Sequence, residues 1–286
     1  MYNIFTMVTF IDLFCGIGSF HYSFKKHGFE CVMACDINKY AKETYKLNYD
    51  MDPKGDIVDI NPDDVPAFNI VCSGFPCQPF SNIGKQKGFD DERGTLFFQI
   101  MKFVTTHNPD VVVLENVSAL LTHDNGATYI RMKTTLENEG YSLVEKILKC
   151  SDYGIPQMRK RLFIVGIKTN LVIEKNIDMS KFLDIPTVPT PTLATYLGKP
   201  FEKDTAFTIR CGGRKSRIDD KHNWDGYIVD GREYRLSIDD CLKLQGFEDF
   251  ELCGSITQQY KLLGNSIPTN FTYLIGKKIK ETLYMN

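Results

Sequence analysis

Residues 9–18 read TFIDLFCGIG, an apolar run of β-forming residues that leads directly into two glycines. Such a run is typical of a strand that is buried on both faces of a sheet. Gly16 and Gly18 let the backbone approach a ligand where a following helix offers free N–H groups. A dinucleotide-binding fingerprint would place a third glycine at position 21, but that residue is His21. The segment therefore predicts the first strand of an α/β sheet with a ligand-binding turn, and disfavours a nicotinamide site.

Strand-like and helix-like segments alternate up to about residue 167. The further apolar runs are 31–35, 70–72, 110–114 and 161–166, and helical spacing occupies 39–49 and 96–107. Alternating βα units predict a doubly wound, mostly parallel sheet. Four prolines between residues 185 and 200 indicate an irregular connection. We therefore expect a catalytic and cofactor-binding domain over 1–167, a smaller loop-rich domain over 168–256, and a return to the first domain over 257–286.

Composition limits the class of protein. The 286 residues are 43% apolar, which allows a full core and excludes a disordered chain. No apolar run reaches membrane-spanning length, and the N-terminus lacks a secretory signal. Nine cysteines without a CxxC pair, and five irregularly spaced histidines, indicate free thiols, no metal site and a reducing, cytoplasmic setting. The net charge of −2 means that any nucleic-acid binding depends on a local basic surface.

A thiol follows one of the predicted strands. Cys77 lies in residues 74–81, GFPCQPFS, between Pro76 and Pro79 and directly after an apolar stretch. The carboxyl end of a buried strand is where open α/β folds place their ligand sites. Free cysteines are commonly small buried hydrophobes, and they become nucleophiles only where the thiolate is favoured. This segment alone leaves both interpretations open.

Acidic residues follow other predicted strands. Asp36 ends the second strand and Asp56 lies at the next turn, and each alone could be a helix cap. The order of the glycine turn, Asp36 and Asp56 favours an adenosyl ligand. Glu115 follows residues 111–114, and burial beside Cys77 would raise its pKa and let it donate a proton.

Two basic residues and one amide complete the candidate site. Arg159 and Arg161 lie at period two in an extended segment, which places them on one face. A solvated edge is the alternative, and it suits Lys160 better than this pair. Asn265, in the polar loop 259–268, is a candidate ligand contact.

The order of these motifs resembles that of the bacterial DNA (cytosine-5) methyltransferase family, of the type II restriction–modification type. The resemblance rests on FCGIG at 14–18, PCQ at 76–78, GTLFF at 94–98, ENV at 115–117, QMRKR at 157–161, LQGF at 244–247 and GNS at 264–266. It covers residues 10 to about 168, and again about 235 to 268. The Asp/Asn-Pro-Pro-aromatic run of amino methyltransferases is not found.

The resemblance implies the fold of S-adenosylmethionine-dependent methyltransferases, which is Rossmann-like, and their chemistry. A methyl group would pass from S-adenosyl-L-methionine to carbon 5 of a flipped-out cytosine in a short specific double-stranded DNA sequence, leaving S-adenosyl-L-homocysteine. Cys77 would form a transient bond to carbon 6, Glu115 would bond ring N3 and the amino group, and Arg161 would hold the carbonyl oxygen, with Arg159 in support. The cofactor residues implied are Phe14, Gly16, Gly18, Asp36, Ile37, Asp56, Pro76, Leu96 and Asn265.

The resemblance also implies contacts to DNA. A loop over residues 83–93, with glycine hinges, would close over the duplex, and the second domain would recognise the target sequence. The DNA-binding residues implied are Ser81, Lys85, Lys87, Arg210, Gly212, Gly213, Arg214 and Arg217. Phosphate anchoring without base readout is the alternative for the arginines. The single tryptophan, Trp224, is expected in the core of the small domain.

We further expect a monomer that protects DNA beside a cognate restriction endonuclease. The competing functions are a tRNA cytosine-5 methyltransferase and a catalytically silent DNA-binding regulator. Four positions depart from the family pattern. In the segment that ends in residues 244–247, Tyr234 stands where an arginine is usual, Asp240 replaces a glutamate, and Lys243 replaces an arginine. An isoleucine, Ile37, stands where a bulky aromatic usually stacks on adenine.

Overall fold

A six-stranded sheet forms the centre of the computed structural model, which describes residues 7–76 and 96–285. The strands are β1 (Thr9–Leu13), β2 (Glu30–Cys35), β3 (Ile70–Ser73), β4 (Val111–Asn116), β5 (Tyr141–Lys149) and β6 (Lys160–Lys168). Their order across the sheet is β2-β1-β3-β4-β6-β5, and β1 to β4 are parallel. The prediction of a mostly parallel α/β sheet is confirmed.

Two strands depart from the parallel pattern. β6 is antiparallel to both β4 and β5, because the short connection 150–159 between β5 and β6 suits an antiparallel pair. β5 was not predicted from the sequence. This edge strand reads YSLVEKILK and is mostly half-buried, so it lacks the continuous apolar run that marks a strand buried on both faces.

Nine α-helices lie in the described ranges, some of them packed on the two faces of the sheet. They are α1 (Ser19–Lys25), α2 (Lys39–Tyr49), α3 (Leu96–His107), α4 (Ala127–Asn138), α5 (Thr169–Glu174), α6 (Leu193–Leu197), α7 (Ile238–Leu244), α8 (Ile256–Asn265) and α9 (Thr269–Ile279). Short 3-10 helices span Ile57–Asp59, Pro62–Asp64, Ser118–Leu121, His123–Gly126, Cys150–Asp152 and Met179–Lys181, and a π-helical turn spans Lys280–Tyr284. The expected helices 39–49 and 96–107 are confirmed at both ends.

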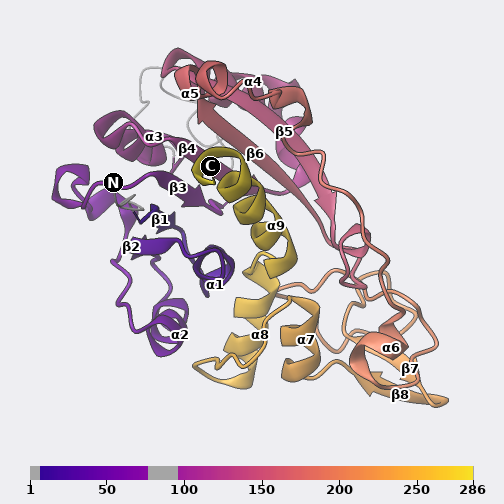
Figure 1. Ribbon diagram of the computed structural model, residues 1–286. Helices are drawn as coiled ribbons and strands as arrows, with labels where there is room; N and C mark the ends of the chain where they lie inside the picture. The colour runs from indigo at the N-terminus through magenta and orange to yellow at the C-terminus, as the bar shows by residue number, and fades with distance from the viewer. Residues whose placement is uncertain (1–6, 77–95, 286) are drawn as a thin grey trace.

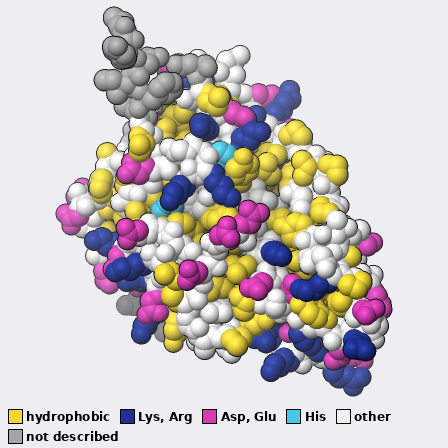
Figure 2. Space-filling view, turned by 60° about the horizontal axis from the view of Figure 1, so that its bottom comes forward, with side chains coloured by type: hydrophobic (Ala, Val, Ile, Leu, Met, Phe, Trp, Pro, Cys, Tyr) yellow, Lys and Arg dark blue, Asp and Glu magenta, His cyan; other side chains and the backbone are white. Residues whose placement is uncertain are grey.

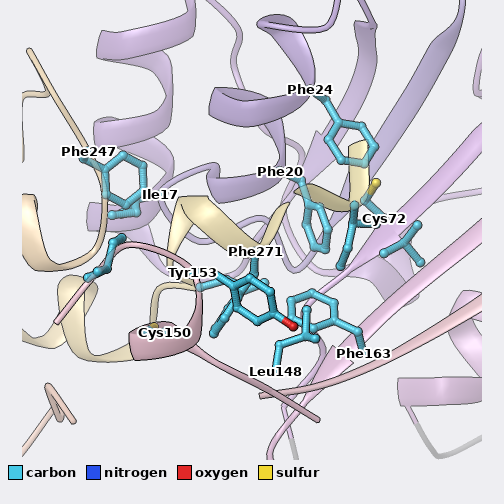
Figure 3. Packing of buried hydrophobic residues seen from close by; sticks show 14 of the residues in the cluster. Ile17, Phe20, Phe24, Cys72, Leu148, Cys150, Tyr153, Phe163, Phe247 and Phe271 are labelled. Atoms are coloured by element: carbon cyan, nitrogen blue, oxygen red, sulfur yellow. The ribbon is translucent and has the colours of Figure 1, made fainter. Parts of the chain in front are cut away.

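Buried side chains alternate between the two faces of the sheet. Phe10, Cys72 and Val113 pack with α1 and α9 on one face, whereas Ile11 and Val112 pack with α3 and α4 on the other. Figure 3 shows part of the first cluster, with side chains from the strands facing those of the helices. Burying one such aliphatic or aromatic side chain contributes about 1.5–3 kcal/mol to the free energy of folding. Packing on both faces therefore stabilises the sheet whose strand ends carry the candidate site.

The last α-helix, α9, packs against the first, α1. Ser23 on α1 donates its hydroxyl to the Thr269 carbonyl oxygen at 3.0 Å, and its oxygen lies 2.7 Å from the Thr272 hydroxyl on α9. Figure 1 shows α9 extending along the sheet beside α1. The start of α9 is thereby held against α1.

A smaller group of elements lies at one end of the sheet (Figure 1). It contains α6, α7 and an antiparallel hairpin of β7 (Gly226–Val229) and β8 (Arg232–Arg235). Trp224 is fully buried there, as expected, and its indole Nε1 donates to the Gly212 carbonyl oxygen at 2.8 Å. Within the two described ranges, no helix is both long and apolar enough to cross a membrane.

Candidate active site

The carboxyl ends of the parallel strands bring the predicted site residues to one edge of the sheet. Asp36 follows β2 and accepts a hydrogen bond at Oδ2 from the Gly16 backbone N–H, 2.8 Å away, at the end of β1. Gly74 follows β3, and a Cβ placed there would lie 3.5 Å from Oε2 of Glu115 on β4. The structure therefore pairs groups that lie 20 and 41 residues apart in the sequence.

The turn after β1 has an unusual backbone. Phe14, Gly16 and Gly18 all have positive φ, at 55°, 55° and 84°. A side chain at Gly18 would be strained by this φ and would force the Tyr49 ring to move, because its Cβ would lie 2.3 Å from that ring. Phe14 is strained there, at a cost of about 1–3 kcal/mol, and such residues concentrate at ligand sites. The sequence predicted the two glycines but not the backbone of Phe14.

The carboxylate of Asp36 is held by backbone groups. Its Oδ1 accepts a hydrogen bond from the Asn38 N–H at 2.7 Å, in addition to that from Gly16. Burial raises the pKa of Asp36, while these two hydrogen bonds act in the opposite direction. A carboxylate has about four acceptor positions, so capacity remains for a ligand hydroxyl. The side chain of the neighbouring Ile37 is 75% exposed.

The other predicted cofactor residues differ in surroundings. Asp56 caps a 3-10 helix by accepting a hydrogen bond from the Val58 N–H at 3.2 Å, which is the helix-cap alternative that the sequence left open. Leu96 begins α3 and is half-buried, Pro76 is exposed after β3, and Asn265 is exposed at the end of α8. Their contact with a cofactor stays a prediction.

Glu115 and Arg161 form an ion pair across the sheet. Arg161 Nε on β6 lies 2.8 Å from Glu115 Oε1 on β4, and the two side chains are only 16% and 8% exposed. Burial raises the pKa of Glu115, opposed by the positive charges of Arg161 and Arg159. The predicted direction of this pKa shift is confirmed. The pair can hold a polar ligand at a defined position, because each partner orients the other.

The segment that leads to Cys77 is fixed against Glu115. The side-chain amide of Asn116 donates to the Phe75 carbonyl oxygen at 3.0 Å, and both residues are buried. Cys77 itself lies outside the described residues, as do Ser81, Lys85 and Lys87 of the predicted DNA contacts. The described ranges contain no group of three or more His, Cys, Asp or Glu placed to hold a metal ion.

Arg159 has a different environment from Arg161. It precedes β6, is 1% exposed, and donates to the carbonyl oxygens of Ile209, Gly264 and Ser266. Burial, followed by the charge of Arg161, lowers its pKa to about 9. Arg159 therefore supports the site through backbone contacts and through its field on Glu115, and its guanidinium faces protein carbonyls.

The predicted DNA-binding arginines lie in residues 208–217, here called the arginine–glycine loop. Arg210 is exposed, as are Gly212 and Gly213. Arg217 makes a two-point contact with exposed Asp219 at 3.1 and 3.0 Å. Arg214 instead stacks 3.7 Å from the ring centroid of Tyr260, and its Nε lies 3.7 Å from the carboxylate of buried Asp225. Base readout by these residues stays a prediction, and Arg214 is already occupied by protein partners.

Sequence reasoning missed several buried polar residues. Asp12 on β1 is fully buried, and neither of its carboxylate oxygens has a hydrogen-bond partner within the described part of the chain. Burial raises its pKa well above the ordinary value. The only signal in the sequence is one acid inside an apolar run. Gln157 and Gln245 are also fully buried, and their motifs gave no indication of their partners.

The molecular surface has no continuous basic region in the view of Figure 2. Lys and Arg side chains lie among Asp and Glu across that face. This distribution agrees with the net charge of −2. On this face, any attraction to phosphates would come from individual basic groups, since exposed charges act over about 8–10 Å at physiological salt.

The fold and this edge define an α/β enzyme whose ligand site combines a glycine turn, a strand-end acid and a buried acid–arginine pair. The model of the C-5 cytosine-specific DNA methylase family matches residues 8–230 and 201–281. The chain is 34% identical to the type II methyltransferase M.HhaI of Haemophilus parahaemolyticus, over 97% of this chain and 96% of that protein. It is 36% identical to M.NgoBI of Neisseria gonorrhoeae, over 90% and 88%.

Solved structures agree on the fold. A DNMT2 mutant from Spodoptera frugiperda gives a TM-score of 0.73 at 18% identity, covering 97% of this chain and all of that one. The methyltransferase EhMeth of Entamoeba histolytica gives 0.72 at 17% identity, covering 96% and 98%. The chain belongs to the C-5 cytosine-specific DNA methylase family. It is a DNA cytosine-5 methyltransferase.

Proposed function

We propose that this enzyme transfers a methyl group from S-adenosyl-L-methionine to carbon 5 of a cytosine flipped out of a short, specific DNA sequence. The observation that carries the proposal is the buried Glu115–Arg161 pair, at 2.8 Å, beside the segment that leads to Cys77. A cytosine inside a duplex cannot enter such an edge, so the base must leave the stack.

The chemistry follows from the weakness of carbon 5 as a nucleophile. The Cys77 thiolate adds its electron pair to carbon 6, and the ring electrons move so that carbon 5 becomes nucleophilic. Carbon 5 would then bond to the methyl group of the sulfonium while the methyl–sulfur bond breaks, and the electron pair of that bond would leave with S-adenosyl-L-homocysteine. A base removes the proton from carbon 5, and the electron pair of that C–H bond reforms the ring double bond as the sulfur leaves. The thiolate is regenerated, so the enzyme turns over.

Glu115 and Arg161 act on the polar edge of the base. Burial raises the pKa of Glu115, which favours the protonated carboxyl group that would donate its proton to ring N3 as carbon 6 is attacked. Arg161 holds the ring carbonyl oxygen and keeps the Glu115 carboxyl oriented. Positioned charge of this kind is effective in catalysis because it needs no reorganisation during the reaction.

The residues at the other strand ends fit an adenosyl ligand. A Cβ placed at Gly16 would meet no atom within 4 Å, which leaves space above the turn, and Asp36 retains acceptor capacity for ribose hydroxyls. Phe14 and Ile37 would flank the adenine, with Gly18, Asp56, Pro76, Leu96 and Asn265 completing the contacts. When bound, S-adenosylmethionine supplies the methyl group as an electrophilic sulfonium.

The proposed biological setting is a restriction–modification system. The enzyme would act as a cytoplasmic monomer that protects the sequence cut by a cognate endonuclease. Arg210, Gly212, Gly213 and Arg217 would contact the target sequence, and Ser81, Lys85 and Lys87 would also contact DNA. Arg214 would support the loop that presents these groups.

The decisive experiment is bisulfite sequencing of DNA from cells that express the protein. We expect one short methylated motif, absent from cells that express Cys77→Ser. Parallel bisulfite sequencing of tRNA tests the competing RNA substrate. Methylated tRNA with unmethylated DNA would overturn the proposed DNA substrate, and no methylation of either would favour a silent regulator.

A further inference from the structure

Three buried polar side chains connect the sheet to two distant loops. Gln157, Arg159 and Gln245 are each 0–1% exposed. Gln157 Nε2 donates to the Leu244 carbonyl oxygen at 2.7 Å, and Gln245 Nε2 donates to that of Leu263. Buried amide and guanidinium groups remain favourable only when they are hydrogen-bonded, so this network constrains the segments that supply the carbonyl groups.

Arg159 lies at the centre of this network. Its Nη1 donates to the Ile209 carbonyl oxygen at 2.9 Å, and its Nη2 donates to those of Gly264 and Ser266 at 3.1 and 2.7 Å. No carboxylate lies within ion-pair distance of it in the described ranges. Burying a guanidinium that has only carbonyl partners removes its hydration and leaves its charge without a counter-ion, which costs free energy, so a purely stabilising role accounts poorly for its presence.

One side of the network fixes the start of the arginine–glycine loop. Ile209 has both backbone groups bound by side chains, since its N–H donates to Gln157 Oε1 at 3.2 Å and its carbonyl oxygen accepts from Arg159. The next residue is Arg210, whose backbone approaches Gly264 so closely that a Cβ there would lie 2.3 Å from the Arg210 carbonyl carbon. Any shift of this loop must therefore move Arg159 or the 264–266 turn.

The other side of the network fixes the turn that carries Asn265. The two carbonyl groups that Arg159 binds through Nη2 belong to Gly264 and Ser266, the residues on either side of Asn265. Asn265 itself is exposed. The guanidinium is planar and its N–H groups have fixed directions, so its contacts to the loop and to this turn cannot move independently.

We propose that Arg159 is a positioning residue that couples the arginine–glycine loop to the Asn265 turn, so that a ligand at one changes affinity at the other. The identities of the two ligands, DNA and the methyl-donor cofactor, rest on the proposed function. The coupling is reciprocal by thermodynamic linkage: a cofactor that reorders the turn strengthens DNA binding by the same factor as DNA strengthens cofactor binding. Arg159 does not touch the base in this scheme.

The chain contains its own reporter for this coupling. Trp224 is the single tryptophan, and its indole N–H binds the Gly212 carbonyl oxygen inside the arginine–glycine loop. S-adenosyl-L-homocysteine, without DNA, serves as the probe for the cofactor site. Its binding is measured by calorimetry, and the response of the loop is measured by Trp224 fluorescence in the same titration.

The test compares Arg159→Met and Arg159→Lys with Lys160→Met, a control at an exposed basic residue of the same segment. Wild type and Lys160→Met should bind the probe and change Trp224 emission in parallel. Arg159→Met should bind the probe at most about tenfold more weakly and lose more than half of the emission change. Arg159→Lys keeps the charge but not the planar guanidinium, so its Trp224 emission change should lie between those of wild type and Arg159→Met. If Arg159→Met does not fold, Arg159→Lys alone provides the test.

Two results would overturn the coupling. Probe binding to wild type without any Trp224 response would show that the turn and the loop move independently. An unchanged response in both Arg159 variants would show that other contacts carry the coupling. Absence of probe binding to wild type is a distinct result, which overturns the proposed cofactor together with the coupling.

Discussion

The catalytic edge and the arginine–glycine loop use arginine in opposite ways. At the edge, Arg161 is 16% exposed and pairs with Glu115, which lies 46 positions earlier on another strand. In the loop, Arg217 is 85% exposed and pairs with Asp219, two residues away. A pair between rigid strands has one geometry, whereas an exposed local pair can be exchanged for a ligand at little cost. The chemistry is therefore built into the sheet, and recognition is presented on the surface.

The largest expected effect comes from removing the proposed nucleophile. Cys77→Ser should lower kcat by on the order of 10⁴-fold, because a hydroxyl lacks the nucleophilicity of a thiolate while the remaining site still binds its ligands. Methyl transfer to DNA is measured with labelled cofactor. The matched control is Cys211→Ser, at the exposed cysteine of the arginine–glycine loop, which should stay near wild type. Normal turnover by Cys77→Ser would exclude the covalent mechanism.

Glu115→Gln should have the next largest effect on activity. The amide cannot donate a proton to ring N3, so kcat should fall by about 10²–10⁴-fold. Glu145→Gln, on the partly exposed edge strand β5, is the matched control and should change kcat little. Equal losses in both variants would indicate damage to the sheet rather than loss of an acid.

The pH dependence of the reaction provides a second measurement on Glu115. Burial raises its pKa, and the proposed acid is active in its protonated form, so kcat/KM should fall as pH rises through this raised pKa. That descending limb should be missing from the Glu115→Gln profile. A limb that persists in the variant would belong to another group.

The sequence predicted the edge much better than the loop, for physical reasons. Parallel strands end at one edge, so residues following apolar runs, such as Asp36 and Glu115, could be placed together before the structure was known. The edge strand β5 was missed because half-burial removes the apolar signal. The partners of Arg159 are backbone carbonyl groups, which any residue possesses, so no sequence pattern marks them. Arg214 and Arg217 occur in one stretch of similar composition, and only the structure separates them.

Arg214→Met should reduce stability more than it changes DNA contacts. The fully buried Asp225 would lose one of its two arginine partners, retaining Arg235 at 3.1 Å. Weakening a buried charge pair in this way should cost about 2 kcal/mol in the free energy of unfolding, measured by urea denaturation. Tyr260 would also lose the stacked guanidinium. An unfolding free energy equal to that of wild type, together with weakened DNA binding, would mean that Arg214 leaves these partners to contact DNA.

Arg217→Met should give the smallest effect on the folded protein and a measurable effect on recognition. Its only side-chain partner found in the structure's described ranges is the exposed Asp219, so the unfolding free energy should not change. If Arg217 reads a guanine edge, the variant should lose about tenfold in preference for the cognate duplex over one with that base pair changed. If it contacts phosphate instead, binding to both duplexes should weaken equally and become less dependent on salt. Binding isotherms for the two duplexes at several salt concentrations distinguish these outcomes. Unchanged binding to both duplexes would show that Arg217 does not contact DNA. Recognition by this loop would then depend on its other exposed residues.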